Sequence, residues 1–225
     1  MNPEFWQSRW QEGRIGFHKS EVNPLLKAYF STLNVAKGGR ILVPLSGKSL
    51  DMAWLTQQSY EVIGIELVES AVEEFFAEQG ITPTVTQASN NADIKRYQGQ
   101  LSGQTIELWV ADIFALTSED VGQIDAVYDR AALIALPPDT RPKYCEHILD
   151  ISDNAPQLLV TIHYDQSQKD GPPFSVSPEQ VRQYYSDTYQ LTELEDNPSI
   201  LNANAALSVT EHVWLLTPNA ANNNP

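Results

Sequence analysis

Residues 40–52 read RILVPLSGKSLDM, and this stretch decides the fold of the chain. Residues 40–45 form a short apolar run typical of a buried strand, and residues 49–59 carry apolar side chains at helical spacing. A strand followed at once by a helix is the repeating unit of an α/β sheet, and such sheets bind ligands where their strands end. The turn between them therefore predicts a binding site.

The centre of this turn, Gly47-Lys48-Ser49, matches the end of a phosphate-binding P-loop, which reads G-x-x-x-x-G-K-[ST]. The first glycine of that motif would lie at position 42, where this chain has Leu42. Two interpretations remain open from these residues alone. One is a P-loop-type kinase that binds ATP with magnesium, and the other is a non-catalytic domain that holds a nucleotide.

Strand-like and helix-like segments alternate along the rest of the chain. Short apolar runs predict strands at residues 61–67, 106–112, 124–129 and 158–163, helical spacing predicts helices at 68–80, 141–151 and 179–186, and two late extended runs lie at 190–194 and 207–216. This order predicts an α/β fold, namely a doubly wound, mostly parallel, Rossmann-like sheet. Because no long helix separates the last two strands, we expect them to form an antiparallel C-terminal hairpin.

Length and composition limit the function. A chain of 225 residues suits one domain, here residues 1–218, and the low-complexity end NAANNNP predicts a disordered tail at 219–225. The net charge of −15 repels phosphate backbones and argues against nucleic acid and anionic membranes as partners. No apolar run is long enough to cross a membrane, and no secretory signal region precedes the first strand, so we expect a soluble, cytoplasmic protein.

Metal and disulfide chemistry are not indicated. The single cysteine, Cys145, excludes a disulfide framework and fits a reducing compartment, and we interpret it as a buried bystander rather than a catalytic thiol. The four histidines are scattered without metal-ligand spacing, so no metal site is predicted.

Polar residues stand at the predicted strand ends. Glu66 follows Gly47 by about 20 residues, which is the spacing of the carboxylate that accepts ribose hydroxyls in nucleotide-binding α/β folds. The pair Asp112-Ile113 suits the edge and face of an adenine, and Asp129-Arg130 ends the fourth strand. Alternative roles are a helix-starting acid for Glu66 and a local ion pair for Asp129 with Arg130.

Six motifs of this chain together resemble the bacterial thiopurine S-methyltransferases, a family of class I S-adenosylmethionine-dependent enzymes. The motifs are F-W-x-x-x-W-x-x-x-x-x-G-F-H (5–18), V-P-L-x-G-K-S-L-D-M (43–52), G-I-E (64–66), D-I-F (112–114), D-R-A-A-L (129–133) and G-P-P-F (171–174). The resemblance extends from Phe5 to about Pro218 and implies a seven-stranded sheet that ends in an antiparallel hairpin. It implies S-adenosylmethionine as methyl donor and a small-molecule thiol as acceptor.

The resemblance also implies roles for individual residues. Trp10, Leu45, Glu66 and Arg130 match cofactor-binding positions, Asp112 and Ile113 match positions that flank adenine, and Phe17 with its neighbour His18 matches the acceptor pocket. Arg130 is the one residue expected to act in catalysis, by stabilising negative charge on the acceptor. No strong general base is expected, because an aromatic thiol ionises easily and the enzyme has mainly to align the reacting atoms.

Trp6 and Trp10 are spaced i, i+4 on an expected N-terminal helix, so residues 1–20 are predicted to cover the cofactor as a lid. The alternative is that these tryptophans only pack on the sheet. Lys48 either pairs with the cofactor carboxylate or is a solvated lysine.

The sequence does not decide which molecule accepts the methyl group. Residues 199–212 lack an arginine that could provide a second acceptor contact, and tellurium or selenium species are an alternative to aromatic thiols. A monomer is expected.

Overall fold

The computed structural model describes residues 3–88, 93–198 and 207–220. In this part of the chain a single sheet of nine strands has the order β3-β4-β5-β2-β1-β6-β7-β9-β8. The strands are β1 (Arg40–Pro44), β2 (Glu61–Glu66), β3 (Thr84–Gln87), β4 (Lys95–Leu101), β5 (Gln104–Val110), β6 (Ala126–Arg130), β7 (Gln157–His163), β8 (Tyr189–Pro198) and β9 (Thr210–Pro218).

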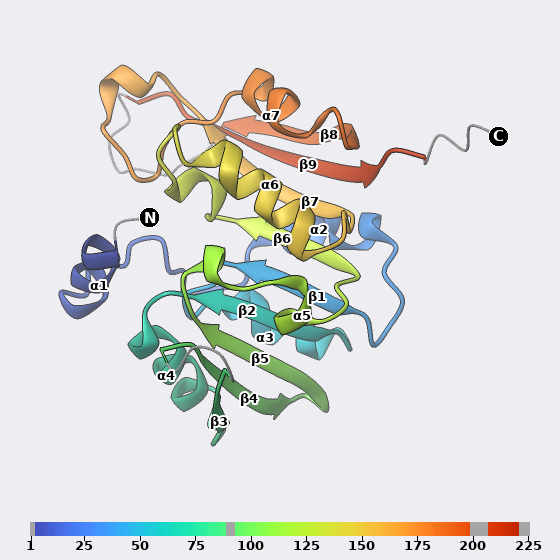
Figure 1. The fold of residues 1–225 in the computed structure, drawn as a ribbon. Helices are drawn as coiled ribbons and strands as arrows, with labels where there is room; N and C mark the ends of the chain where they lie inside the picture. The colour runs from blue at the N-terminus through green and yellow to red at the C-terminus, as the bar shows by residue number, and fades with distance from the viewer. Residues whose placement is uncertain (1–2, 89–92, 199–206, 221–225) are drawn as a thin grey trace.

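The five central strands, β5-β2-β1-β6-β7, pair in parallel, and β8 and β9 form an antiparallel hairpin on the edge next to β7. Both features confirm the predicted α/β fold. The arrowheads of β1, β2, β5 and β6 point to the same side of the sheet, and the first helix, α1 (Pro3–Gln11), lies beyond them on that side (Figure 1). The carboxyl ends of the parallel strands therefore meet beneath α1.

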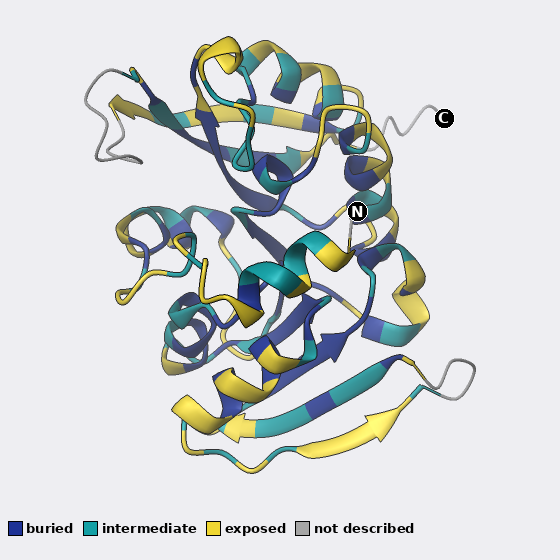
Figure 2. Cartoon of the chain, turned by 90° about the vertical axis from the view of Figure 1, so that its left-hand side faces the viewer, coloured by how far each residue is buried: buried dark blue, intermediate teal, exposed yellow. Residues whose placement is uncertain are grey.

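The expected count of seven strands is wrong, because a second antiparallel hairpin, β3–β4, extends the sheet beyond β5. Tyr97 is the one buried residue of β4, and β3 is exposed throughout, as its yellow ribbon in Figure 2 shows. These edge strands are held mainly by backbone hydrogen bonds to their neighbours. They have no apolar run that would reveal them in the sequence.

Two groups of helices cover the two faces of the sheet (Figure 1). The helices after α1 are α2 (Pro24–Tyr29), α3 (Leu50–Gln57), α4 (Glu69–Glu78), α5 (Ser118–Val121), α6 (Arg141–Ile151) and α7 (Pro178–Tyr185), with short 3₁₀ segments η1 (Phe30–Leu33), η2 (Ile113–Ala115), η3 (Leu133–Ala135) and η4 (Gln166–Gln168). Alternation along β1 sends Ile41 and Val43 to the core shared with α2, α3 and α4, and Leu42 to the core shared with α5, α6 and α7.

Glycines permit two features of this frame. Gly80 follows α4 with a φ of +68°, which agrees with the predicted helix end. At Gly64 in β2 a Cβ would overlap the side chain of Leu108 and lie 2.8 Å from Ser46 Oγ. The missing side chain thus lets β2 approach the turn that follows β1.

The predicted disordered tail, residues 219–225, falls mostly outside the described part of the chain. The backbone N–H of Asn219 donates to Thr188 O at 2.9 Å, so this residue is still attached to the fold. Residues 221–225 lie outside the described part of the chain.

Candidate active site

A cavity of about 410 Å³ lies at the carboxyl ends of the central parallel strands, next to α1, which crosses the foreground of Figure 2. Six of the eight predicted site residues line it, namely Trp10, Phe17, His18, Leu45, Glu66 and Arg130, and so do Trp6 and Lys48. They come from α1, the segment after it, the β1–α3 turn and the ends of β2 and β6. The fold thus brings together residues that are far apart in the sequence.

Two left-handed backbone conformations border the cavity. Leu45, directly after β1, has a φ of +46°, and Ala131, directly after β6, has a φ of +65°. This region costs a residue with a side chain about 1–2 kcal/mol, and such strain is concentrated at ligand sites. The chain therefore turns sharply at both strand ends, which leaves the space between β1 and β6 open.

Glu66 connects the end of β2 to the β1–α3 turn. Its Oε2 accepts the N–H of Gly47 and its Oε1 accepts the N–H of Val68, each at 2.8 Å. Burial raises the pKa of this carboxyl, and the backbone N–H groups that it accepts oppose the rise. Each carboxylate oxygen has a second lone pair, so Glu66 can still accept hydroxyl groups from a ligand in the cavity.

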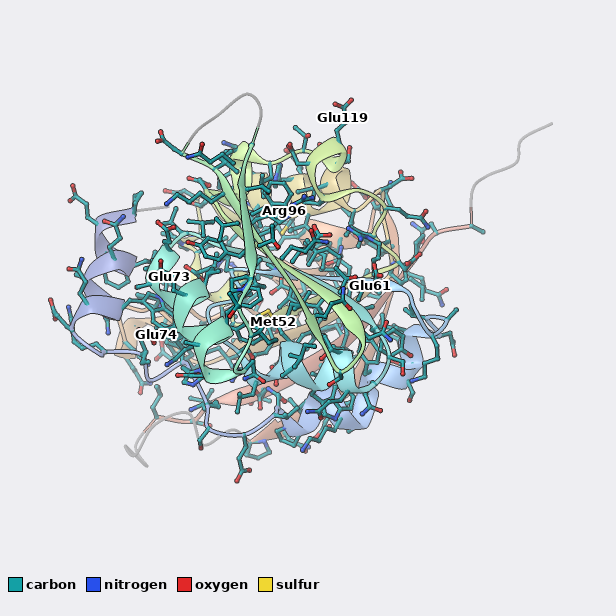
Figure 3. All side chains as sticks on the ribbon, turned by 90° about the horizontal axis from the view of Figure 1, so that it is seen from below. Met52, Glu61, Glu73, Glu74, Arg96 and Glu119 are labelled. Carbon is teal, nitrogen blue, oxygen red and sulfur yellow. The ribbon has the colours of Figure 1, made fainter. Side chains whose placement is uncertain are left out.

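Lys48 lines the cavity but is not solvated, so that alternative is wrong, and its pairing with the cofactor carboxylate stays a prediction. Its Nζ pairs with Glu74 Oε2 at 2.8 Å and Glu78 Oε1 at 2.6 Å, and the residue is buried. Both acids belong to α4, and the labelled Glu74 lies on this helix on the same side of the molecule as α1 in Figure 3. Lys48 therefore attaches the β1–α3 turn to α4, and its charge is already neutralised.

Asp129 and Arg130 do not form the local ion pair that was the alternative to a functional role. The Asp129 carboxylate is fully buried, where Oδ2 accepts the hydroxyl of Tyr144 at 2.7 Å and Oδ1 accepts the N–H of Leu133 at 3.2 Å. Successive side chains of a strand point to opposite faces, so Arg130 points away from Asp129. Arg130 lines the cavity, and its guanidinium forms no hydrogen bond or ion pair with any other described residue.

We expect Asp129 to make a contribution to the free energy of unfolding that is larger at acidic pH. Burial raises its pKa from 3.8 to about 6, so the native state binds this proton more tightly than the unfolded chain. That contribution is present below about pH 4 and is lost as the pH rises through about 6, a change of roughly 2–3 kcal/mol. In Asp129→Asn, where an amide can donate to Tyr144 and still accept from Leu133, this pH dependence should disappear. Urea denaturation of the wild type and of Asp129→Asn at pH 4.5 and pH 7 measures this pH dependence. If the two proteins differ in free energy of unfolding by the same amount at both pH values, the pKa of Asp129 is not raised in the native state.

The N-terminal helix packs on the turn through Trp10. Trp10 is 8% exposed, and its Cζ2 would lie 3.2 Å from a Cβ placed on Gly47. Both Trp6 and Trp10 make edge-on contacts with Phe17, with ring centroids at 5.8 and 5.7 Å. Helix α1 thus forms one wall of the cavity.

His18 follows Phe17 in the same wall. Burial and the nearby charge of Lys48 lower the pKa of its imidazole, so it is neutral at pH 7. No other described residue forms a hydrogen bond with its ring.

Asp112 and Ile113 lie outside the lining of the cavity. Asp112 Oδ1 accepts the N–H of Phe114 at 3.1 Å and so caps η2, and the Ile113 side chain is fully buried in the core. They stand close to the site nonetheless, because the N–H of Ala111 donates to Glu66 O at 2.9 Å. Their assignment to adenine stays a prediction.

Sequence reasoning missed several residues of the cavity. Tyr128 donates its hydroxyl to Asp51 Oδ2 at 3.0 Å, and both line the cavity together with Pro172, Pro173 and Glu211. The motif G-P-P-F was a signal for the two prolines. Glu211 lies in a β9 segment that no motif marks.

Metal binding, thiol chemistry and membrane insertion can each be compared with the described residues. They contain no group of three or more His, Cys, Asp or Glu side chains that could hold a metal ion. Cys145 is buried in the core, and burial raises the pKa of its thiol to about 12, which fits the bystander interpretation. No helix of the described ranges is long and apolar enough to cross a membrane.

Comparison with known proteins agrees with this geometry. The model of the thiopurine S-methyltransferase family matches residues 1–218. The thiopurine S-methyltransferase of Psychrobacter cryohalolentis is 61% identical over 216 residues, covering 96% of this chain and 99% of the relative. That of Xanthobacter autotrophicus is 43% identical over 217 residues, with the same coverage of both chains.

Solved structures agree in fold. The magnesium protoporphyrin IX methyltransferase of Synechocystis, crystallised with S-adenosylhomocysteine, has a TM-score of 0.65 at 12% identity and covers 96% of this chain and 98% of its own. The 1,6-didemethyltoxoflavin-N1-methyltransferase of Burkholderia thailandensis has a TM-score of 0.62 at 13% identity, and the match covers 96% of this chain and 87% of that enzyme. At these identities the likeness establishes the fold alone.

The mostly parallel sheet with a cavity at its strand ends, together with the 61% identical relative, identifies the chain as an S-adenosylmethionine-dependent methyltransferase. The family match over residues 1–218 takes the assignment one step further. The chain belongs to the thiopurine S-methyltransferase family.

Proposed function

We propose that this enzyme transfers the methyl group of S-adenosylmethionine to the sulfur of an aromatic or heterocyclic thiol. The observation that carries the proposal is the unpaired guanidinium of Arg130, which lines the same cavity as Glu66 and the β1–α3 turn. The names of the relatives support a thiol acceptor over a tellurium or selenium species.

The residues present fit the methyl donor. Glu66 offers acceptor lone pairs to ribose hydroxyls, Leu45 turns the backbone around the cavity, and Trp10 covers it. Arg130 supplies a cation that no described residue neutralises by direct contact. In this proposal Asp112 and Ile113 flank the adenine, and residues 1–20 act as the lid.

The rest of the mechanism is positioning. S-adenosylmethionine supplies a methyl group that is already activated by a positively charged sulfur. Phe17 and His18 form an acceptor wall that excludes water, and Arg130 stabilises negative charge on the acceptor sulfur. Holding the reacting groups in line can contribute about 7–11 kcal/mol in favourable cases. We also propose that the enzyme is a monomer, acts in the cytoplasm and needs no metal ion.

The kinase alternative is not favoured. A P-loop lysine has to reach the phosphates of its ligand, whereas Lys48 is paired with Glu74 and Glu78. The alternative of a non-catalytic module makes a different prediction from the enzyme, because it turns over no acceptor.

The proposal predicts a specific effect of Arg130→Lys. Lysine keeps the charge but loses the planar fork of donors, so kcat/KM for an aromatic thiol should fall at least about tenfold, or roughly 1.4 kcal/mol. The melting temperature should stay the same, because Arg130 makes no ion pair within the described chain. Transfer of labelled methyl groups and thermal denaturation measure the two effects.

Arg182→Lys is the matched control. Arg182 lies on α7 outside the cavity and faces Glu193 at 3.8 Å, so its replacement should leave the kinetics unchanged. Wild-type kinetics in Arg130→Lys would remove Arg130 from the reaction, and the absence of turnover of any thiol by the wild type would overturn the proposed function.

A further inference from the structure

The cavity contains one carboxylate for which neither the fold nor the reaction described so far has a use. Three acidic residues line the cavity, and two of them are occupied: Glu66 accepts Gly47 and Val68, and Asp51 accepts Asn23 and Tyr128. The third, Glu211 on β9, is half-buried, and its side chain forms no hydrogen bond or ion pair with any other described residue. Its lone pairs are therefore available to a ligand.

Glu211 and Arg130 stand on opposite sides of an apolar floor. Glu211 lies opposite Ile162 of β7 in the antiparallel pair, and Arg130 lies beside Val160 of β7 in the parallel pair. Val160 and Ile162 both line the cavity, and two strand spacings, about 10 Å, separate the backbones of β6 and β9. Both charged side chains are long enough to reach over the floor between them.

This arrangement selects a particular acceptor chemistry. A guanidinium only donates hydrogen bonds, and a carboxylate only accepts them. A planar ring on the apolar floor would then place its sulfur toward Arg130 and an N–H toward Glu211. Heterocyclic thiols with a neighbouring ring nitrogen meet this requirement, because their thione form carries the proton on that nitrogen. A carbocyclic thiol offers no N–H.

We propose that Glu211 binds the ring N–H of a heteroaromatic thione and takes its proton as the sulfur is methylated. This inference rests on the proposed function and adds a base to it. The N–H electron pair becomes a ring C=N bond, and the C=S π pair forms the new S–CH₃ bond. The bond between the methyl group and the donor sulfur breaks and leaves its pair on that sulfur. The proton ends on the Glu211 carboxylate and passes to water.

The charges around Glu211 agree with this role. Burial raises the pKa of its carboxyl, and Glu195 on β8 adds to the rise, whereas Arg130 on β6 and Lys19 after α1 oppose it. Tyr128 on β6 also faces this carboxylate and stays protonated, since its pKa lies well above the ordinary value. A carboxylate with a raised pKa accepts a proton more readily.

The test compares two acceptors in Glu211→Gln. With purine-6-thione kcat/KM should fall at least about tenfold, since general-base catalysis contributes about 10²–10⁴-fold. With benzenethiol, which has no N–H, it should change less than about twofold by the same argument. Glu211→Asp should recover part of the loss. Glu119→Gln is the control, because it removes an exposed acid on α5 that does not line the cavity.

A binding measurement completes the test without turnover. Absorbance titration of purine-6-thione in the presence of S-adenosylhomocysteine should show weaker binding to Glu211→Gln than to the wild type. Equal losses for both acceptors, or no loss for either, would overturn the role of Glu211. If the wild type methylates neither acceptor, the proposed function fails, and equal affinities in the titration then overturn this inference as well.

Discussion

Removal of residues 1–18 is expected to abolish methyl transfer while the sheet stays folded. Helix α1 is attached through a small cluster in which Trp10 packs with Val68 and Ala71, separate from the two large cores on either face of the sheet. The deletion also removes Phe17 and His18, which form the acceptor wall in the proposed function. The cavity would then be open to water, and the reacting groups would no longer be aligned.

Far-UV circular dichroism and a labelled-methyl assay measure the two parts of this expectation. In the full-length protein, trypsin should cut at Arg9 or Arg14, and S-adenosylhomocysteine should slow the cleavage if α1 closes over it. The point variant Trp10→Ala should reproduce most of the loss of activity. Trp54→Ala, which removes a ring that packs on Phe30 away from the cavity, is the control. Cleavage at the same rate with and without ligand would show that α1 is only packed on the fold.

Glu66→Ala is expected to weaken S-adenosylhomocysteine binding by about a hundredfold, since hydrogen bonds to a charged group contribute about 1.5–3 kcal/mol and each 1.4 kcal/mol is a factor of ten. The structure adds a second effect. The substitution leaves the N–H groups of Gly47 and Val68 without their acceptor, so the β1–α3 turn should loosen and the melting temperature should fall. Isothermal titration calorimetry and thermal denaturation separate these effects.

Glu69→Ala provides the matched control for Glu66. Glu69 is also a carboxylate near the start of α4, but it binds Lys95 and Tyr97 and does not line the cavity. Its replacement should leave ligand affinity unchanged. Unchanged affinity in Glu66→Ala, or tight binding of ATP with magnesium by the wild type, would contradict the assignment of Glu66 to the ribose.

The fold was predictable where burial shapes the sequence. Strands such as β2, covered on both faces, are nearly continuous apolar runs, and α4 and α6 show helical spacing and recognisable ends. The β3–β4 hairpin was not predictable, because an edge strand needs only backbone pairing and one buried side chain. The C-terminal edge of the sheet was therefore predicted, whereas the β3–β4 edge was not.

The site was predictable to the extent that it lies at strand ends. Leu45, Glu66 and Arg130 follow or end apolar runs, so the general rule for α/β sheets placed them at one edge. The partners of Lys48 and Asp129 were not predictable. Glu74 and Tyr144, which bind them, come from helices whose positions relative to the strands follow from packing.

The sequence by itself determined the order of the parallel strands and the C-terminal hairpin, the strand ends at which the cavity forms, and the motifs of the thiopurine S-methyltransferase family. These features are local, because they depend on periodicity and on short stretches of side chains. The tertiary structure decided which charges stay available for chemistry. Lys48 and Asp129 find partners across the fold and are neutralised or buried, whereas Arg130 and Glu211 remain without a direct partner among the described residues. Whether a charged side chain in the cavity lacks a partner depends on which long-range contacts form, and no local stretch of sequence contains that information.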